Sequence, residues 1–252
     1  MINVNTLRHP KEQVYFGAAA VAGGLVWLIL LLMTFGTILI WAIPGAISLW
    51  ITGQFFKAQL FGNSVKVSEN QYPEIYNIVK ECSKSLNLSS IPDVFIINSS
   101  GTTNAIAIRL LSKKYVLLYS ELIDLMILNK KGIGMDELKM IIGHELAHHA
   151  AGHISPLKNI LLFPAMFIPF LGNAYSRACE LTADRIGAAF TQDMDASKRA
   201  LVALACGSDA LADKTNIESF LQQEKDVPSI AGFISELYSS HPRMTIRIKE
   251  LK

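Results

Sequence analysis

Charged side chains are scarce in this chain of 252 residues, and cysteine is scarcer still. Asp, Glu, Lys and Arg make up 17% of the residues, and the net charge of +2 argues against a nucleic-acid partner. The three cysteines, Cys82, Cys179 and Cys206, lack the spacing of a zinc finger or of a disulfide framework. We expect them to be buried as small apolar residues, which excludes a disulfide-stabilised domain.

The shortage of charge is concentrated near the N-terminus. From Val14 to Phe56 the chain has no Asp, Glu, Lys or Arg. One membrane span needs about 20 apolar residues, and this stretch is about twice as long. It predicts two spans, at residues 14–33 and 37–57, joined by a turn near Met33–Thr37. A single long, tilted span is the alternative. We do not expect a cleavable signal peptide, because the run is too long and no small-residue cleavage site precedes polar sequence.

The charges that flank this stretch predict its orientation. Arg8 and Lys11 precede it, Lys57 and Lys66 follow it, and the connecting turn has no charge. Lys and Arg next to membrane spans stay on the cytoplasmic side. We therefore expect a multi-pass protein of the inner or plasma membrane, in contact with the lipid bilayer, whose remaining residues face the cytoplasm.

The rest of the chain has the composition of a globular domain. Apolar residues at helical spacing predict a helix at 68–88, with Ser68 or Asn70 as its N-cap. Alternation of apolar residues predicts three strands, at 91–100, 102–110 and 113–120. Turn residues at 99–101 and 112–114 separate these strands and indicate an antiparallel meander.

Helices dominate the second half of the chain. They are expected at about 119–128, 135–152, 174–192, 195–211, 216–224, 228–239 and 243–251. The predicted fold class is therefore mainly α with a small antiparallel β-sheet, plus an N-terminal transmembrane helical hairpin. Residues 1–60 are expected to form the membrane anchor and residues 61–252 the globular domain.

A second apolar stretch, residues 154–175, is interrupted by proline and is short for a membrane span. An apolar length of about 10–14 residues is typical of core, interfacial or re-entrant segments. We expect this stretch to touch the membrane surface or to line a cleft, with a buried loop as the alternative.

Four of the six histidines lie in the segment MIIGHELAHHAAGH, residues 140–153. Residues four apart share one face of a helix, so His144 can act with His148, and His149 with His153. The two pairs point in different directions, and only one of them is expected to bind a metal ion.

Glu145 distinguishes the two pairs. In the arrangement His144-Glu145-x-x-His148, two imidazoles bind one metal ion and the carboxylate lies beside the open position of the metal. In the second pair, Ala150 occupies the place of that carboxylate. We therefore predict that His144 and His148 are the ligands and that the other two histidines support them or lie on the surface.

A catalytic zinc ion usually has three protein ligands, so one more is needed. Glu180 lies within an amphipathic helix at 176–187, among apolar residues where an unpaired carboxylate is costly. As the third ligand it leaves one position open, and Asp184, one turn later, can orient a ligating histidine. The alternative is that both carboxylates pair with Arg177 and Arg185 on a solvated face.

The C-terminal segment HPRMTIRI, residues 241–248, contains His241 and Arg247. In one interpretation His241 caps the terminal helix and Arg247 lies on the surface. In the other, both reach the cleft, where they stabilise an oxyanion or hold a substrate carboxylate. The residues alone leave the two interpretations open.

Four segments, in this order, resemble the HtpX-like membrane zinc metallopeptidases, relatives of the Ste-type CAAX prenyl proteases. They are TNAIA (103–107), GHELAHHAAGH (143–153), ELTAD (180–184) and HPRMTIRI (241–248). The resemblance implies a zincin-like metallopeptidase domain with one Zn²⁺ per chain. Ile106 departs from the family pattern, which often has Phe at this place.

The resemblance also implies functions for individual residues: His144, His148 and Glu180 as zinc ligands, Glu145 as general base, Asp184 as the residue that orients a ligand, His241 and Arg247 at the reaction centre, and Asn104 beside the substrate. Glu145 would take a proton from the attacking water and pass it to the leaving amine. An extended polypeptide would add to the strand around Asn104. Such recognition suits unfolded or damaged membrane proteins as substrates.

Two other functions are compatible with the same motifs. A CAAX-type protease that trims prenylated peptides would need a larger transmembrane chamber than two spans provide. A non-catalytic membrane protein that binds metal or acts as an adaptor would have lost the general base, but Glu145 is present. The motifs therefore favour a membrane-bound zinc endopeptidase, without indicating its cleavage preference or oligomeric state.

Overall fold

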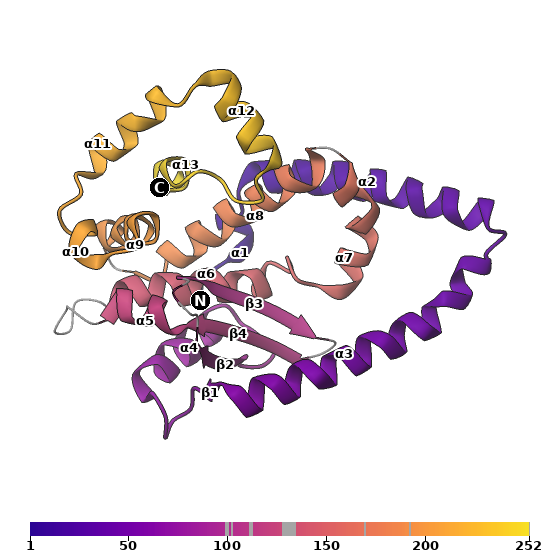
Figure 1. Ribbon diagram of the computed structural model, residues 1–252, viewed down its shortest axis with the longest axis horizontal. Helices are drawn as coiled ribbons and strands as arrows, with labels where there is room; N and C mark the ends of the chain where they lie inside the picture. The colour runs from indigo at the N-terminus through magenta and orange to yellow at the C-terminus, as the bar shows by residue number, and fades with distance from the viewer. Residues whose placement is uncertain are drawn as a thin grey trace.

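The computed structural model is mainly helical, with a small sheet (Figure 1). It describes residues 1–252 except 99–100, 102, 111–112, 128–134, 169, 192 and 252. The predicted turns at 99–101 and 112–114, and the predicted helix ends at 128 and 192, lie wholly or partly outside the described residues. The predicted fold class is confirmed, because helices dominate, the sheet is small and two apolar helices lie near the N-terminus.

The charge-free stretch forms a helical hairpin. Helix α2 begins with Pro10 at its first position, and the His9 side chain accepts a hydrogen bond from the backbone N–H of Lys11. The turn after α2 contains Gly36 with a φ of 78°, a value that favours glycine. The hairpin and the residues before it comprise α1 (Val4–Leu7), α2 (Pro10–Met33), η1 (Thr37–Trp41) and α3 (Ala42–Asn63).

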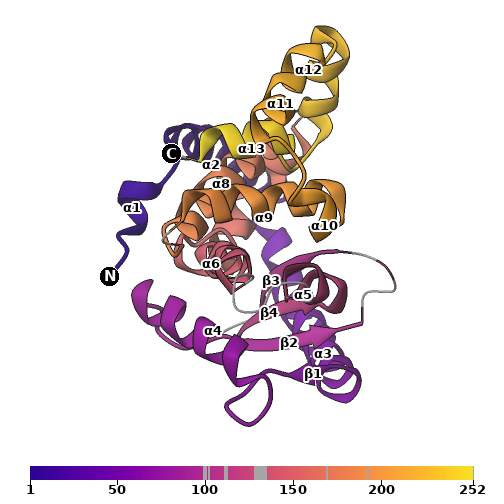
Figure 2. The same ribbon diagram turned by 90° about the vertical axis from the view of Figure 1, so that its left-hand side faces the viewer.

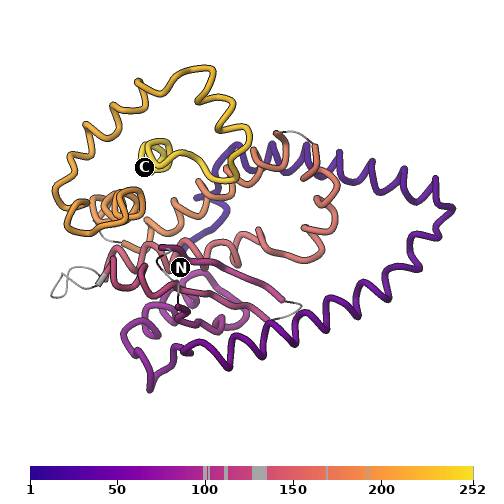
Figure 3. The backbone as a smooth tube through the Cα atoms, viewed as in Figure 1, coloured from indigo at the N-terminus to yellow at the C-terminus, as the bar shows by residue number. Residues whose placement is uncertain are grey.

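Both arms of the hairpin are long and apolar enough to cross a membrane, and they meet at a tip far from the rest of the chain (Figure 3). Large apolar side chains are exposed along both arms, among them Leu25 and Leu32 in α2 and Ile43 and Trp50 in α3. The core helix of a soluble protein would bury such side chains, so the apolar surface calls for an apolar environment.

The sheet has four strands in the order β1-β2-β4-β3. β2 and β4 are parallel, and the other two pairs are antiparallel. The sheet is therefore mixed, and the expected antiparallel meander is wrong in one pairing, because β2 runs parallel to β4. The long run of buried residues in β4 takes a central position, whereas the half-buried β3 takes the edge. The strands are β1 (Val65–Lys66), β2 (Asp93–Ile97), β3 (Ala105–Leu110) and β4 (Lys113–Tyr119).

Different helices cover the two faces of the sheet. On one face, Val116 and Leu118 belong to the main hydrophobic core together with the helices that follow the strands. On the other face, Tyr115 and Leu117 pack against Leu60 of α3. This contact explains why α3 continues past its predicted end at residue 57. The helices of the main core, on the face of Val116 and Leu118, are α4 (Pro73–Ser85), α5 (Ser120–Ile127) and α6 (Met135–Ala150).

Helix α4 begins later than predicted. Ser68 pairs with Gln71 across a turn, and neither Ser68 nor Asn70 caps the helix. The helix starts at Pro73, which suits the first helical position because it has no N–H and a fixed φ.

The segment 154–175 lies against α2. Leu162 and Ala165 are buried beside Ala19 of α2, whereas Leu157 and Phe167 are exposed. The segment is therefore not a fully buried loop, because one side contacts the hairpin and the other shows apolar side chains. It comprises α7 (Pro156–Leu162), η2 (Phe163–Phe167) and the first residues of α8 (Leu171–Ala188).

The C-terminal part of the chain is a series of helices. The predicted helix 195–211 is broken at Gly207, whose φ of 67° ends a helix. Cys82 and Cys179 are buried as expected, but Cys206 is exposed beside this break, so its predicted burial is wrong. The elements are α9 (Met194–Cys206), α10 (Asp209–Ala212), α11 (Ile217–Gln222), η3 (Gln223–Asp226), α12 (Ser229–Tyr238) and α13 (Met244–Glu250).

Helices α6 and α8 cross at two glycines. A Cβ atom at Gly187 would lie 2.6 Å from the backbone oxygen of Met140, and one at Gly143 would lie 2.6 Å from Cδ2 of Phe190. Figure 2 shows α6 between the sheet and the helices α8 and α9. The absence of two side chains therefore sets how closely the backbones of α6 and α8 approach.

We predict that Gly187→Ala lowers the free energy of unfolding by about 1–3 kcal/mol, because the new methyl group overpacks the crossing. Thermal unfolding of the full chain in detergent measures the effect. Gly62→Ala is the matched control, since its Cβ would meet nothing within 4 Å in α3. An equal unfolding temperature for Gly187→Ala and the wild type would show that the crossing tolerates a side chain.

Candidate metal centre

Helix α6 presents His144, Glu145 and His148 to a cleft. Most of its residues are good helix formers, and Asp136 and Glu137 in the first turn complement the helix dipole. Because the two histidines are four residues apart, their rings lie on one face, with ring centroids 5.0 Å apart. His144 and Glu145 are buried.

Helix α8 supplies two carboxylates opposite these histidines. Glu180 approaches both imidazoles, with its Oε2 atom 3.4 Å from Nε2 of His144 and its Oε1 atom 3.5 Å from Nε2 of His148. One turn later, Oδ1 of Asp184 lies 2.9 Å from Nδ1 of His144. The structure thus brings together the side chains that the sequence grouped from two separate helices.

The alternative pairing of these carboxylates on a solvated face is wrong. Arg177 donates to the backbone oxygens of Glu236 and Ser239, and Arg185 donates to the Glu250 carboxylate. Glu180 instead faces the cleft with only 12% of its side chain exposed.

The three donor groups fit one zinc ion. A tetrahedral zinc site with bonds of about 2.0–2.1 Å places neighbouring donor atoms about 3.3–3.4 Å apart. Nε2 of His144 lies 3.3 Å from Nε2 of His148, and each of these nitrogens lies 3.4–3.5 Å from an oxygen of Glu180. Two imidazoles and one carboxylate also match the donor set of a catalytic zinc site with one open position.

The charges around the donors favour a cation between them. Burial lowers the pKa of His144, but hydrogen bonds to Asp184 and Glu180 outweigh burial and raise it to about 10. Burial, which Glu180 offsets only in part, lowers the pKa of His148 to about 3. The two carboxylates therefore favour a positive charge at the place where the donor set would hold a metal cation.

Asp184 is held by Arg247 in a two-bond pair. Nε of Arg247 donates to Oδ2 over 2.8 Å, and Nη2 donates to Oδ1 over 2.7 Å. Both side chains are buried, and Arg247 keeps the pKa of Asp184 below its usual value against the effect of burial. An ionised Asp184 accepts from Nδ1–H of His144, which leaves the lone pair of His144 on Nε2.

The C-terminal segment reaches the cleft. His241 lies with Nε2 3.7 Å from Oε2 of Glu180, and 64% of its side chain is exposed. It does not cap α13, whose N-cap is Arg243. Arg247 also lines the cleft, with Nη2 4.0 Å from Oε2 of Glu180, and is not a surface residue.

Glu145 and Asn104 lie on the walls of a cleft of about 540 Å³. Burial raises the pKa of Glu145 to about 7, although a hydrogen bond from the backbone of Ala107 lowers it in part. A carboxyl group with this pKa can accept and release a proton near neutrality. Asn104 directly precedes the edge strand β3, whose residues Ala105–Ala107 form one wall of the cleft.

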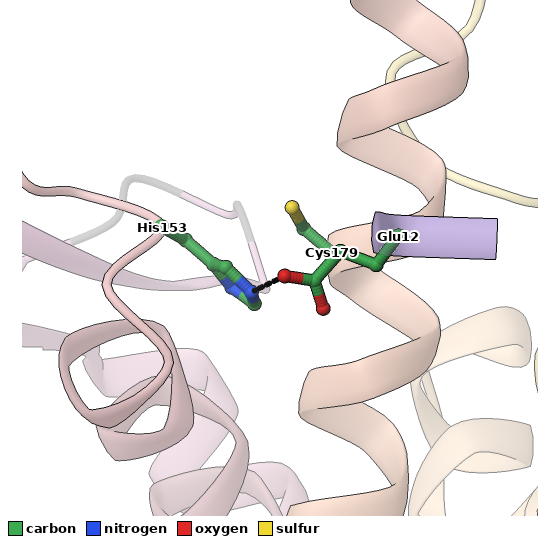
Figure 4. A group of neighbouring side chains, drawn as sticks. All are labelled: Glu12, His153 and Cys179. Carbon is green, nitrogen blue, oxygen red and sulfur yellow. Dashed lines mark hydrogen bonds and ion pairs between the residues drawn. The ribbon is translucent and has the colours of Figure 1, made fainter. Parts of the chain in front are cut away.

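The two remaining histidines of α6 and its C-terminal loop have different surroundings. His149 is buried, and its Nε2 donates to the backbone oxygen of Tyr115, away from the cleft. His153 lies beyond the end of α6, so it does not share a helical face with His149. Its Nδ1 lies 2.9 Å from Nδ1 of His148. Its Nε2 lies 3.2 Å from Oε1 of Glu12, the contact that Figure 4 shows.

Glu12 is a polar residue near the site that the sequence did not indicate. It lies in the first turn of α2, is 1% exposed and pairs with Arg8. Its only signal in the sequence is that it is the last carboxylate before the charge-free stretch. Arg8, which we interpreted as a flanking charge of the membrane anchor, is part of this buried pair.

We predict that Asp184→Asn weakens zinc binding by about 10–100-fold, because the amide no longer fixes the tautomer of His144 as a carboxylate does. Competition with a chromophoric chelator measures the dissociation constant. Asp195→Asn, at an exposed carboxylate of α9, is the control and should bind zinc like the wild type. Unchanged affinity in Asp184→Asn would mean that this carboxylate does not orient a ligand.

Comparisons with known proteins identify the family of this chain. The sequence profile of Peptidase family M48 matches residues 69–161 and 156–252. The plastoglobule-localized metallopeptidase 48 of Arabidopsis thaliana chloroplasts is 28% identical, over 85% of this chain and 68% of its own length.

The crystal structure of S. mikatae Ste24p matches with a TM-score of 0.44 and 18% identity. The match covers 90% of this chain and 66% of Ste24p, so this chain spans just under two thirds of that protein. Since the family profile covers well over half of the sequence, the chain belongs to peptidase family M48 and is a metallopeptidase.

Proposed function

We propose that the chain is a membrane-anchored zinc endopeptidase that hydrolyses internal peptide bonds of polypeptides. His144, His148 and Glu180 hold one Zn²⁺ per chain. The observation that carries the proposal is the spacing of their donor atoms, 3.3–3.5 Å, beside the buried carboxylate of Glu145 in one cleft. Two imidazoles, one carboxylate ligand and a second, unligated carboxylate are the groups that metal-assisted peptide hydrolysis requires.

When bound, a zinc ion would lower the pKa of a water molecule to about 7 and polarise the carbonyl of the scissile bond. Glu145 accepts the proton of the attacking water and delivers it to the leaving amine nitrogen. Glu145 directly follows His144 in α6, so the helix keeps the general base at a fixed distance from this ligand.

His241 and Arg247 both approach Oε2 of Glu180, but their functions differ. The exposed imidazole of His241 reaches into the cleft from the segment before α13 and would donate to the developing oxyanion. Arg247 is already paired with Asp184, so its main contribution is to hold that carboxylate in place.

The substrate binds as an extended strand along β3. This strand pairs with β4 on one side only, and its residues form one wall of the cleft together with Asn104. Backbone hydrogen bonds to an edge strand select an extended backbone more than particular side chains. Unfolded segments of membrane proteins, presented at the membrane surface, have this character.

The hairpin and the segment 154–175 attach the peptidase to the bilayer. The hairpin exposes apolar side chains over both arms, and Leu157 and Phe167 continue this surface beside α2. The exposed Lys11, Lys57 and Lys66 lie at the base of the hairpin, which favours a cytoplasmic position for the base and for the peptidase domain.

We predict that Glu145→Gln retains zinc and loses peptidase activity on a casein-like substrate by about 10²–10⁴-fold, because the amide cannot accept the proton. His144→Ala is expected to lose both zinc and activity. Elemental analysis and a fluorescent peptide-release assay measure the two properties separately.

Glu137→Gln is the matched control, since Glu137 is a buried carboxylate of α6 that pairs with Arg199 away from the cleft. Full turnover by Glu145→Gln would reject the assigned base. Cleavage of prenylated peptides with no cleavage of casein would favour the CAAX-type activity.

We also predict the topology of the anchor. In a background with the exposed Cys206 replaced by Ser, a cysteine introduced as Thr37→Cys should react with a membrane-impermeant thiol reagent added outside intact cells. A cysteine introduced as Glu218→Cys, on α11 of the peptidase domain, should react only after permeabilisation. Labelling of Glu218→Cys in intact cells would reverse the proposed orientation.

A further inference from the structure

A chain of buried polar groups leads from His148 away from the cleft to the first turn of α2. We propose that His153 and Glu12 are positioning residues, which hold His148 in the tautomer and orientation that bind the metal ion. This inference rests on the proposed zinc site, and it assigns the beginning of the membrane anchor a function in that site.

The end of α6 places His153 beside His148. The helix stops at Ala150, and Gly152 follows with a φ of 75°. The backbone N–H of His153 then donates to the backbone oxygen of His148 over 3.0 Å, which is the Schellman arrangement of a helix C-terminus. As a result the two rings lie with their centroids 5.0 Å apart, and their Nδ1 atoms are 2.9 Å apart.

Glu12 receives three donors inside the protein. Figure 4 shows its carboxylate directed from α2 toward the ring of His153, whose Nε2 lies 3.2 Å from Oε1. The hydroxyl of Thr182 donates to Oε2 over 2.5 Å, and the guanidinium of Arg8 pairs with Oε1. A carboxylate that is 1% exposed needs such partners to stay charged.

These bonds determine the positions of the protons. An ionised carboxylate only accepts hydrogen bonds, so Nε2 of His153 must donate to Glu12. In a neutral imidazole the other nitrogen is an acceptor, so Nδ1 of His153 accepts from Nδ1–H of His148. His148 is left with its lone pair on Nε2, the atom that faces His144 and Glu180. A metal ligand requires that lone pair.

His144 is oriented in the same way, but no residue lies between it and its carboxylate. Asp184, paired with Arg247, accepts directly from Nδ1 of His144. For His148, the carboxylate–arginine pair is Glu12 with Arg8, and His153 links it to the ligand. Each histidine is thus oriented by a buried carboxylate that an arginine neutralises.

Glu12, His153 and Cys179 also invite a different interpretation, a second metal site, because their donor atoms lie within 4.8 Å of one another. Two observations argue against it. Both nitrogens of His153 already have partners, and Arg8 places a positive charge on Glu12, where a cation would have to bind.

The test compares zinc affinity in the full chain, purified in detergent, by competition with a chromophoric chelator. His153→Leu should weaken zinc binding by about 10–100-fold and alter the visible absorption of the Co²⁺-substituted protein, which reports ligand geometry. His153→Gln should recover most of the affinity, because its amide has both a donor for Glu12 and an acceptor for His148. Glu12→Ala should weaken binding in the same direction, and Glu12→Gln less.

His149→Gln is the matched control, since His149 is an equally buried histidine of α6 that bonds to the sheet. It is expected to lower the unfolding temperature without changing zinc affinity. An equal loss of affinity in His149→Gln and His153→Leu would overturn the proposal in favour of general destabilisation. So would wild-type affinity in His153→Leu, even while the wild type binds one zinc ion and the proposed function stands.

Two further outcomes separate the proposals. A second zinc ion per chain that is lost in Cys179→Ser would make the cluster a metal site and reject the positioning function. A wild-type protein that binds no zinc would reject both this inference and the proposed function.

Discussion

The close crossing of α6 and α8 is the constraint on which the rest of the structure depends. Two glycines let the backbones approach until a Cβ atom added at Gly187 would lie 2.6 Å from the backbone oxygen of Met140, and one added at Gly143 would lie 3.2 Å from Cα of Gly187. At this distance the imidazoles of one helix and the carboxylates of the other come within 2.9–3.5 Å. The geometry of the proposed zinc site is therefore a consequence of packing between two helices, and the sheet and remaining helices support that contact.

Two buried carboxylate–arginine pairs lie beside the candidate metal site. Asp184 and Glu12 are both 1% exposed, and each is paired with an arginine. A buried ion pair contributes little net stability, because desolvation offsets much of the attraction. In our proposal each pair instead selects the tautomer of a histidine, since a fixed carboxylate determines which ring nitrogen of its neighbour carries the proton. One of these two buried pairs lies beside His144, and the other reaches His148 through His153.

The apolar hairpin and the domain that carries the candidate metal site are linked more closely than a flexible tether would allow. The first arm of the hairpin begins beside α8 and the second arm ends on the outer face of the sheet. The helix that carries Glu12, whose carboxylate contacts His153, continues into the first apolar arm. The cleft, the edge strand and the apolar segment beside α2 then lie in a fixed relation to the proposed bilayer.

The sequence by itself determined what depends on residues close together in the chain. The helical hairpin, the face shared by His144 and His148, and the isolation of Glu180 among apolar residues all follow from local spacing and from the cost of burying charge. Only the tertiary structure decided which strands are parallel, because alternation marks a strand without naming its partner. It also decided that Glu12 meets His153, since a buried pair that is 141 residues apart leaves no periodic pattern in the chain.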